Sequence, residues 1–138
     1  MGDVTPLKKI CKVLIVEDDG AVREVLADVF ESEGYRFILT ANAAELRAAL
    51  ASDPDIDILI IDVRLRGGDS GLVLAEEAAS RGLPVVLTSG DHTQLDEMTK
   101  SGHPHILKPF RLSSLLALVD ETLRTTKANC RRDLRAAS

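Results

Sequence analysis

Asp57-Ile58-Leu59-Ile60-Ile61-Asp62 is the stretch of sequence that decides the fold. Its four consecutive apolar residues are typical of a strand that is covered on both faces, as in the middle of a parallel sheet. Asp62 ends the run, and in open α/β sheets ligands bind at the carboxyl ends of the strands. A lone Asp after a strand is also a common helix cap or loop residue. Its partners at other strand ends therefore decide whether Asp62 is a functional residue.

Strand and helix signals alternate five times along the chain. Val22, Val25, Leu26 and Val29 recur at the spacing of an amphipathic helix, which we expect to end at Gly34. Five β-α units with right-handed crossovers predict an α/β fold, a parallel sheet with helices on both faces. The expected strands cover residues 13–16, 35–40, 58–61, 84–88 and 105–108, and the expected helices begin near residues 20, 42, 72, 91 and 112. The helix at about 91–101 has few large apolar residues and is expected to be the least firmly packed.

Length and composition indicate one soluble domain. A chain of 138 residues, 45% apolar and 28% charged, is long enough to bury a hydrophobic core without disulfides or metal ions to stabilise it. Its two cysteines lie near opposite ends without metal-ligand spacing, so we expect neither a zinc site nor a disulfide framework. The apolar runs are far below the roughly 18 residues of a membrane span, and no signal-peptide pattern opens the chain. These features predict a cytoplasmic protein without a membrane partner.

The charges are distributed unevenly. The net charge is −5, yet residues 1–12 and 127–138 are basic, and residues 13–126 are strongly acidic. An acidic body is a poor binder of nucleic acid. The basic tail could contact a polyanion or an acidic partner, although a solvated terminus is the simpler interpretation.

Residues suited to one site follow four of the expected strands: Glu17 and Asp18, Asp62, Thr88 and Lys108. The carboxyl ends of parallel strands share one edge, and carboxylates within about 5 Å repel by roughly 3 kcal/mol per pair at an effective dielectric near 20. Protonation of one carboxylate or a cation must offset this repulsion. Mg²⁺ meets the need, because it characteristically takes one or two carboxylates, waters and a phosphate. Lys108 adds a positive charge. The group suits a phosphoryl substrate.

Each of these residues also has a purely structural interpretation. Glu17 and Asp18 could favour the dipole of the following helix. Thr88 could simply end a strand as a β-branched residue. Lys108 could be a solvated residue that protects an edge strand from pairing with another chain.

The five residues, in this order and each at its strand end, resemble the receiver domain of two-component response regulators over residues 12–125. The resemblance implies a flavodoxin-like, doubly wound (βα)5 fold with strand order 2-1-3-4-5. It divides the chain into an N-terminal extension (1–11), a receiver domain (12–126) and a basic tail (127–138) without an output domain. A free-standing receiver and one cut from a longer regulator or hybrid kinase both stay open.

The resemblance implies that Asp62 accepts a phosphoryl group from a sensor histidine kinase or phosphotransfer protein. Asp18, Asp62 and the backbone carbonyl of Arg64 would bind Mg²⁺ directly, and Glu17 would act through a metal-bound water. Such a domain catalyses only its own phosphorylation and dephosphorylation and is not an enzyme in the usual sense.

The positive charge of Lys108, the Thr88 hydroxyl and the Ser89 backbone N–H would contact the phosphoryl oxygens, and the Lys108-Pro109 peptide would be cis. Thr88 and His105 would form the switch that changes the surface after phosphorylation. A downstream protein target is implied, a homodimer is possible, and no direct contact with nucleic acid is expected.

The sequence departs from the usual receiver pattern at several positions. Arg66 stands where the family commonly has Pro, and the loop to Gly71 is one residue longer than usual. His105 replaces the switch Tyr or Phe, and an imidazole is smaller and more polar, so its inward position should be less favoured. Arg64 and Gly90 hold the two positions that, by resemblance, tune hydrolysis of the acyl phosphate.

Two other classes of function remain possible from the sequence. A receiver-like interaction module that is never phosphorylated is one, although Asp62, Asp18 and Lys108 argue against it. A nucleotide- or flavin-binding enzyme on a similar sheet is the other, but the first strand is followed by acidic residues and not by a glycine-rich loop. A hydrolase of the haloacid type would need its nucleophile directly after the first strand. Asp62 instead follows the third expected strand.

Overall fold

The computed structural model describes residues 11–66 and 70–126. The predicted tail, and the predicted N-terminal extension apart from Cys11, lie outside the described residues. The elements are β1 (Lys12–Val16), α1 (Gly20–Ser32), β2 (Arg36–Thr40), α2 (Ala43–Ser52), β3 (Ile58–Asp62), α3 (Gly71–Ser80), β4 (Val85–Ser89), the 3₁₀ helix η2 (His92–Gln94), α4 (Leu95–Ser101), β5 (His105–Leu107) and α5 (Leu112–Thr125).

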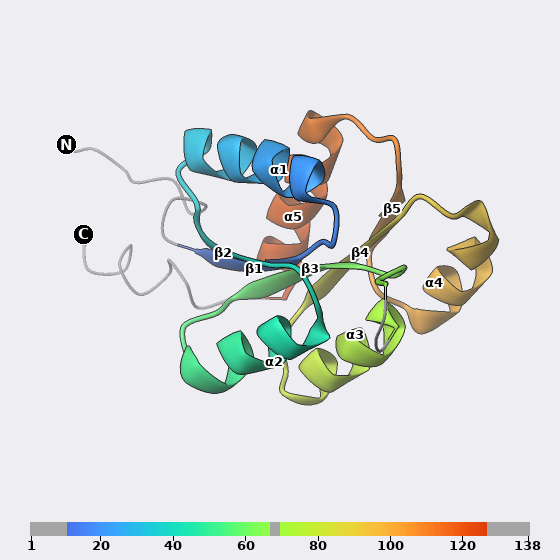
Figure 1. Cartoon of the computed structure of the whole chain (residues 1–138), viewed down its shortest axis with the longest axis horizontal. Helices are drawn as coiled ribbons and strands as arrows, with labels where there is room; N and C mark the ends of the chain where they lie inside the picture. Colours follow the sequence, from blue (N-terminus) through green and yellow to red (C-terminus); the bar gives the residue numbers. More distant parts are fainter. Residues whose placement is uncertain (1–10, 67–69, 127–138) are drawn as a thin grey trace.

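The five strands form one parallel sheet in the order β2-β1-β3-β4-β5. This order confirms the prediction, and it places β3 in the centre of the sheet. Helices α1 and α5 cover one face, and α2, α3 and α4 cover the other (Figure 1). The sheet therefore has a separate apolar core on each face.

Alternate residues of β3 serve the two cores. Ile58 and Ile60 pack in the cluster of α1 and α5, whereas Leu59 and Ile61 pack in the cluster of α2, α3 and α4. All four are at most 1% exposed. The apolar run of the sequence is therefore explained by a central strand that is covered on both faces.

Side-chain caps begin α1 and α2. The Asp19 carboxylate accepts hydrogen bonds from the backbone N–H groups of Ala21 and Val22 at the start of α1. At the start of α2, Asn42 accepts from the N–H of Glu45, whose carboxylate in turn accepts from the N–H of Ala41. This reciprocal arrangement is close to a capping box, of which Asn42 followed by Glu45 three residues later is the typical sequence pattern.

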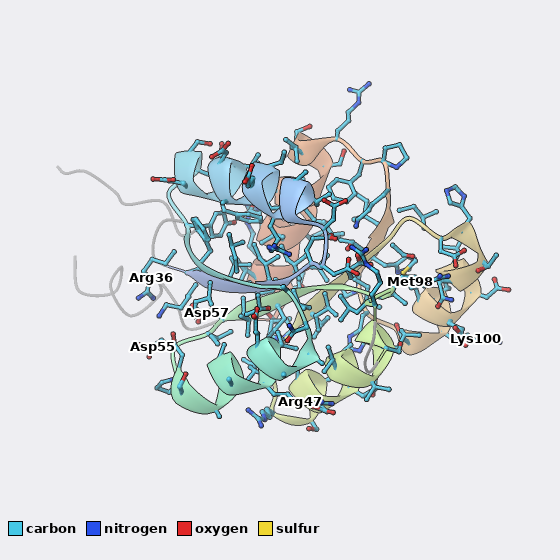
Figure 2. The ribbon with its side chains drawn as sticks, in the orientation of Figure 1. Arg36, Arg47, Asp55, Asp57, Met98 and Lys100 are labelled. Carbon is cyan, nitrogen blue, oxygen red and sulfur yellow. The ribbon has the colours of Figure 1, made fainter. Side chains whose placement is uncertain are left out.

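The weak fourth helix differs from the prediction in form. The expected helix over 91–101 is divided into η2 and the short α4, with Asp91 accepting a hydrogen bond from the N–H of Thr93. Met98 is the buried residue of α4 and lies on its inner side, while Lys100 points outward (Figure 2). A single buried anchor agrees with the weak apolar pattern of this segment.

Two further observations concern expectations from composition. Cys11 is fully buried beside β1 and is disulfide-bonded. The expectation of no disulfide is therefore wrong for Cys11, because cysteines far apart in the sequence carry no spacing signal.

Among the described residues, no helix is long and apolar enough to cross a membrane.

Gly71 lets α3 begin directly against the end of β3. Its backbone N–H donates to the carbonyl oxygen of Val63 at 3.0 Å. A Cβ atom at position 71 would lie 2.2 Å from the carbonyl oxygen of Asp62 and 2.7 Å from the Cα of Val63. Both contacts are with backbone, which cannot move aside as a flexible side chain can.

Replacing Gly71 with Ala should lower the free energy of unfolding by about 1–3 kcal/mol, because the new methyl group overpacks the end of β3. Urea unfolding measures this change. Gly20→Ala is the control, because its Cβ would meet only the end of the Arg23 side chain at 3.3 Å and Ala is the better helix former. Equal stabilities of the two variants would contradict the close approach at Gly71.

Candidate functional site

The strand-end residues singled out in the sequence meet at one edge of the sheet. Glu17 directly follows β1, Asp62 ends β3 and is in register with Thr88 of β4, and Lys108 follows β5. The backbone N–H of Lys108 donates to the carbonyl oxygen of Ser89 at 2.8 Å, which fixes the end of β5 against β4. The predicted gathering of these residues is confirmed.

Three carboxylates form the acidic cluster of the site, Glu17, Asp18 and Asp62. Each offers one oxygen atom, and these atoms all lie within 4.8 Å of one another. Glu17 is 2% exposed and Asp62 is 4% exposed, so water does little to screen their charges. Nearby cations must compensate this buried negative charge.

Lys108 is the first of these cations and contacts two members of the acidic cluster. Its Nζ lies 2.7 Å from Glu17 Oε1 and 3.1 Å from Asp62 Oδ2. Burial alone would lower the pKa of Lys108, but the hydrogen bond to Glu17 and the charge of Asp62 raise it above its ordinary value. The ammonium therefore stays charged at neutral pH. The peptide between Lys108 and Pro109 is cis, as predicted.

Glu17 is under opposing influences. Burial raises the pKa of its carboxyl group, and the nearby charge of Asp62 acts in the same direction, while the hydrogen bond from Lys108 opposes them. The net direction is upward. Lys108 therefore only partly compensates the cost of burying the Glu17 charge.

Asp18 has a different cation, Arg66. The backbone N–H of Arg66 lies 3.1 Å from Asp18 Oδ2, and its Nε lies 2.9 Å from the same oxygen. Burial would raise the pKa of Asp18, but the hydrogen bonds from Arg66 outweigh it and hold the pKa below its ordinary value. The sequence identified Arg66 only as a departure from the usual Pro. A long basic side chain beside an acidic cluster was the available signal.

The carboxylate of Asp62 is held at both oxygens. The backbone N–H of Arg64 donates to Oδ1 at 3.0 Å, and Lys108 donates to Oδ2. The sequence had predicted a role for the carbonyl of Arg64, and this N–H contact was not foreseen. Two donors therefore fix the orientation of this buried carboxylate.

Thr88 and Ser89 are both buried, at 3% and 0% exposed. The backbone carbonyl of Thr88 accepts from the N–H of Val63 at 2.8 Å, which binds β4 to the residue after Asp62. The Ser89 hydroxyl accepts from the N–H of Asp91 at 3.0 Å. The two residues therefore lie at the edge where Asp62 ends.

An ion pair between loops borders the site. The guanidinium of Arg64 donates to the carboxylate of Asp91, which joins the segment after β3 to the segment after β4. A cavity of about 450 Å³ lies beside this pair, and it is lined by Asp62, Arg64, Gly90, Asp91, His92 and Lys108. Sequence analysis did not single out Asp91, because an Asp in a loop has no periodic pattern.

His105, the predicted switch residue, is half-buried on β5. Its Nδ1 lies 2.9 Å from the backbone carbonyl oxygen of His103, and the His103 Nε2 lies 3.1 Å from a carboxylate oxygen of Glu76. A local backbone contact therefore fixes the imidazole of His105. Its role as a switch stays a prediction.

The acidic cluster fits a hard divalent cation. Its ligand atoms are all carboxylate oxygens, which Mg²⁺ prefers, and their close spacing would allow one ion to contact more than one of them. The cluster already needs positive charge, as Lys108 and Arg66 show. On this donor set, Asp18 and Asp62 could hold Mg²⁺, with Glu17 beside them.

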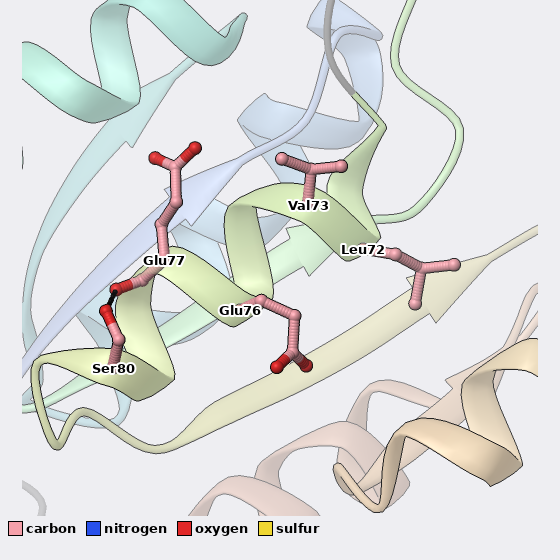
Figure 3. A pocket seen from close by; sticks show the side chains of 5 residues that line it. All are labelled: Leu72, Val73, Glu76, Glu77 and Ser80. Atoms are coloured by element: carbon pink, nitrogen blue, oxygen red, sulfur yellow. Dashed lines mark hydrogen bonds between the residues drawn. The ribbon is translucent and has the colours of Figure 1, made fainter.

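A second pocket lies on α3, away from the acidic cluster (Figure 3). Leu72 and Val73 line one end of it, and two glutamates and Ser80 line the other. Glu77 is paired with Arg47 at 2.6 Å. This pocket offers no group activated for chemistry, so the strand-end cluster remains the candidate site.

Comparison with known proteins agrees with the fold and the site. The family model of the response regulator receiver domain matches residues 13–120. Transcriptional regulatory protein AruR of Pseudomonas aeruginosa is 27% identical over 124 residues, which cover 84% of this chain and 50% of AruR. Transcriptional regulatory protein PdtaR of Mycobacterium tuberculosis is 31% identical over 113 residues, which cover 79% of this chain and 55% of PdtaR. The chain spans about half the length of these curated relatives.

Solved structures agree with the same fold. A response regulator receiver protein from Pseudomonas putida has a TM-score of 0.72 at 29% identity, covering 80% of this chain and 96% of that one. A CheY-like receiver domain protein from Methanospirillum hungatei has a TM-score of 0.76 at 24% identity, covering 86% of this chain and 97% of that one. The chain belongs to the response regulator receiver domain family of two-component signalling systems.

Proposed function

We propose that this receiver accepts a phosphoryl group on Asp62 from a phosphohistidine of a sensor histidine kinase or phosphotransfer protein, in a reaction that depends on Mg²⁺. The observation that carries the proposal is the buried carboxylate of Asp62, held by two donors within the acidic cluster of oxygen ligands. A carboxylate oxygen of Asp62 attacks phosphorus. The P–O bond forms as the P–N bond breaks, and the imidazole leaves.

The charges at the site support transfer of a phosphoryl group and not proton transfer. Phosphoryl transfer needs positioning and neutralisation of the phosphoryl oxygens more than it needs acid-base catalysis. Lys108 is charged and lies 3.1 Å from Asp62, so its ammonium would contact a phosphoryl oxygen there. Mg²⁺ held by Asp18, Asp62 and the carbonyl of Arg64, with Glu17 behind a bound water, would supply the remaining positive charge.

Thr88 and Ser89 would act after transfer. The Thr88 hydroxyl and the Ser89 N–H would donate to phosphoryl oxygens, and the movement of Thr88 would let the ring of His105 turn inward. The surface formed by α4, β5 and α5 would then change. Arg64 and Gly90 border the cavity beside Asp62, where a water that hydrolyses the acyl phosphate would approach.

The signal would leave the domain through contacts with another protein in the cytoplasm. The acidic character of residues 13–126 favours a protein target over direct contact with nucleic acid, and a second copy of the chain is one possible partner. Residues 12–126 would act as the receiver in a free-standing chain or as part of a longer regulator. In either case the domain modifies only itself.

A receiver that is never phosphorylated is the second candidate. The contact of Arg66 with Asp18 favours it, because this guanidinium holds a carboxylate that Mg²⁺ would need. The intact positions of Asp62 and Lys108 favour the first proposal.

Incubation with acetyl phosphate and Mg²⁺ should add one phosphoryl group to the wild-type chain, observed by intact mass measurement. Asp62→Asn should add none, because its amide is not a nucleophile toward phosphorus. Leaving out Mg²⁺ should abolish the addition as well. An unchanged wild-type mass would support the interaction module, and labelling of Asp62→Asn would place the acceptor elsewhere.

Lys108→Met should slow phosphorylation on the order of 100-fold, because one preorganised positive charge is lost from the transition state. The rate is measured with acetyl phosphate at saturating Mg²⁺, and circular dichroism checks the fold. Lys100→Met is the matched control, because Lys100 is exposed on α4 and points away from the sheet (Figure 2). Equal rates for the two variants would contradict the role of Lys108.

His105→Tyr should increase the response of the surface to phosphorylation, since a phenol ring favours the inward position more than an imidazole does. Amide exchange across residues 90–110, with and without a phosphoryl mimic, measures the response of each variant. Wild type should change less than His105→Tyr. An equal response in both would show that the residue at position 105 does not limit the switch.

A further inference from the structure

Arg66 makes a two-point contact with one oxygen of Asp18. Its backbone N–H and its Nε both donate to Oδ2, at 3.1 and 2.9 Å. Both donors approach the same oxygen, so a metal ion that binds this oxygen competes with them. The Arg66 side chain is 80% exposed and the Asp18 side chain is 18% exposed. The guanidinium can therefore leave into water without opening the core.

Two cations that differ in solvent exposure, Lys108 and Arg66, contact the acidic cluster. Lys108 contacts Glu17 and Asp62, and its side chain is 24% exposed. Arg66 contacts Asp18 alone. A divalent cation that binds both Asp18 and Asp62 needs one oxygen of each, and Arg66 contacts Oδ2 of Asp18, the more exposed of these two carboxylates.

We propose that Arg66 competes with the divalent cation for Asp18, so that metal binding displaces its side chain and weakens the affinity of the site. This inference rests on the proposed Mg²⁺ site and adds a residue that sets its affinity. Displacement of the Nε and backbone N–H contacts also links metal binding to the segment that follows β3. Receivers of this family commonly have Pro at this position, and Pro has neither donor.

The expected effect is modest, because ion pairs with an exposed partner are weak. Arg66→Gln should bind Mg²⁺ about two- to fivefold more tightly than wild type, measured by isothermal titration calorimetry on the full chain at 0.15 M salt. Arg66→Lys keeps the charge but not the planar guanidinium, and it should fall between the two.

Arg23→Gln is the matched control for a general charge effect. Its guanidinium donates to the backbone carbonyl of Glu17 at 2.7 Å, so it lies beside the cluster without contacting a carboxylate of it. Arg23→Gln should change the affinity by less than Arg66→Gln does. A gain for Arg66→Gln no larger than that of the control would overturn the inference.

A spectroscopic measurement tests the displacement directly. The Nε–Hε resonance of Arg66 in ¹⁵N-labelled protein should shift as Mg²⁺ is added, over the same concentrations as the amide of Asp62. A resonance that stays unchanged while the Asp62 amide titrates would overturn the inference. The Arg66→Gln variant assigns the signal.

Failure of the inference can be separated from failure of the proposed function. Binding that is lost in Asp18→Asn but does not respond to Arg66→Gln would contradict only the competition. Absence of Mg²⁺ binding in wild type and in every variant would overturn both the competition and the proposed metal site.

Discussion

The repulsion between Glu17 and Asp62, two carboxylates buried side by side at the sheet edge, is the constraint on which the site depends. At this spacing it amounts to roughly 3 kcal/mol per pair at an effective dielectric near 20. Lys108 offsets it by contacting both groups. The three residues come from the ends of three different strands, so only the parallel sheet order brings them together. The parallel strand order is therefore needed to place Lys108 where it compensates both carboxylates.

The central part of the fold could be predicted because it follows simple periodic patterns. Ile58 to Ile61 form an apolar run that only a strand covered on both faces explains, and Asn42 and Glu45 form a cap that depends on local spacing. The convergence of Asp62 and Lys108 could also be predicted, because the ends of parallel strands share one edge. Chemistry placed at strand ends is thus open to sequence reasoning even where the strands are far apart in the chain.

What could not be predicted lies in loops and long side chains. The partner of Arg66, the ion pair of Arg64 with Asp91 and the disulfide of Cys11 depend on loop paths that carry no period. The division of the expected 91–101 helix into η2 and α4 has the same origin, because a segment with Met98 as its main anchor leaves the backbone free to adopt either helix type. Sequence patterns report which residues are buried. They do not indicate which residue an exposed guanidinium contacts.

The difference in exposure between the two cations gives the acidic cluster two unlike halves. Lys108 serves two carboxylates that are nearly inaccessible to water, so its removal would leave two uncompensated buried charges. Arg66 serves one carboxylate near the surface, where water can replace it at little cost. The Arg66 half is the one that lies open to solvent, whereas Asp62 is oriented by Lys108 and the Arg64 N–H. The buried half therefore holds Asp62 in a fixed orientation, whereas the exposed half has a cation that water can replace.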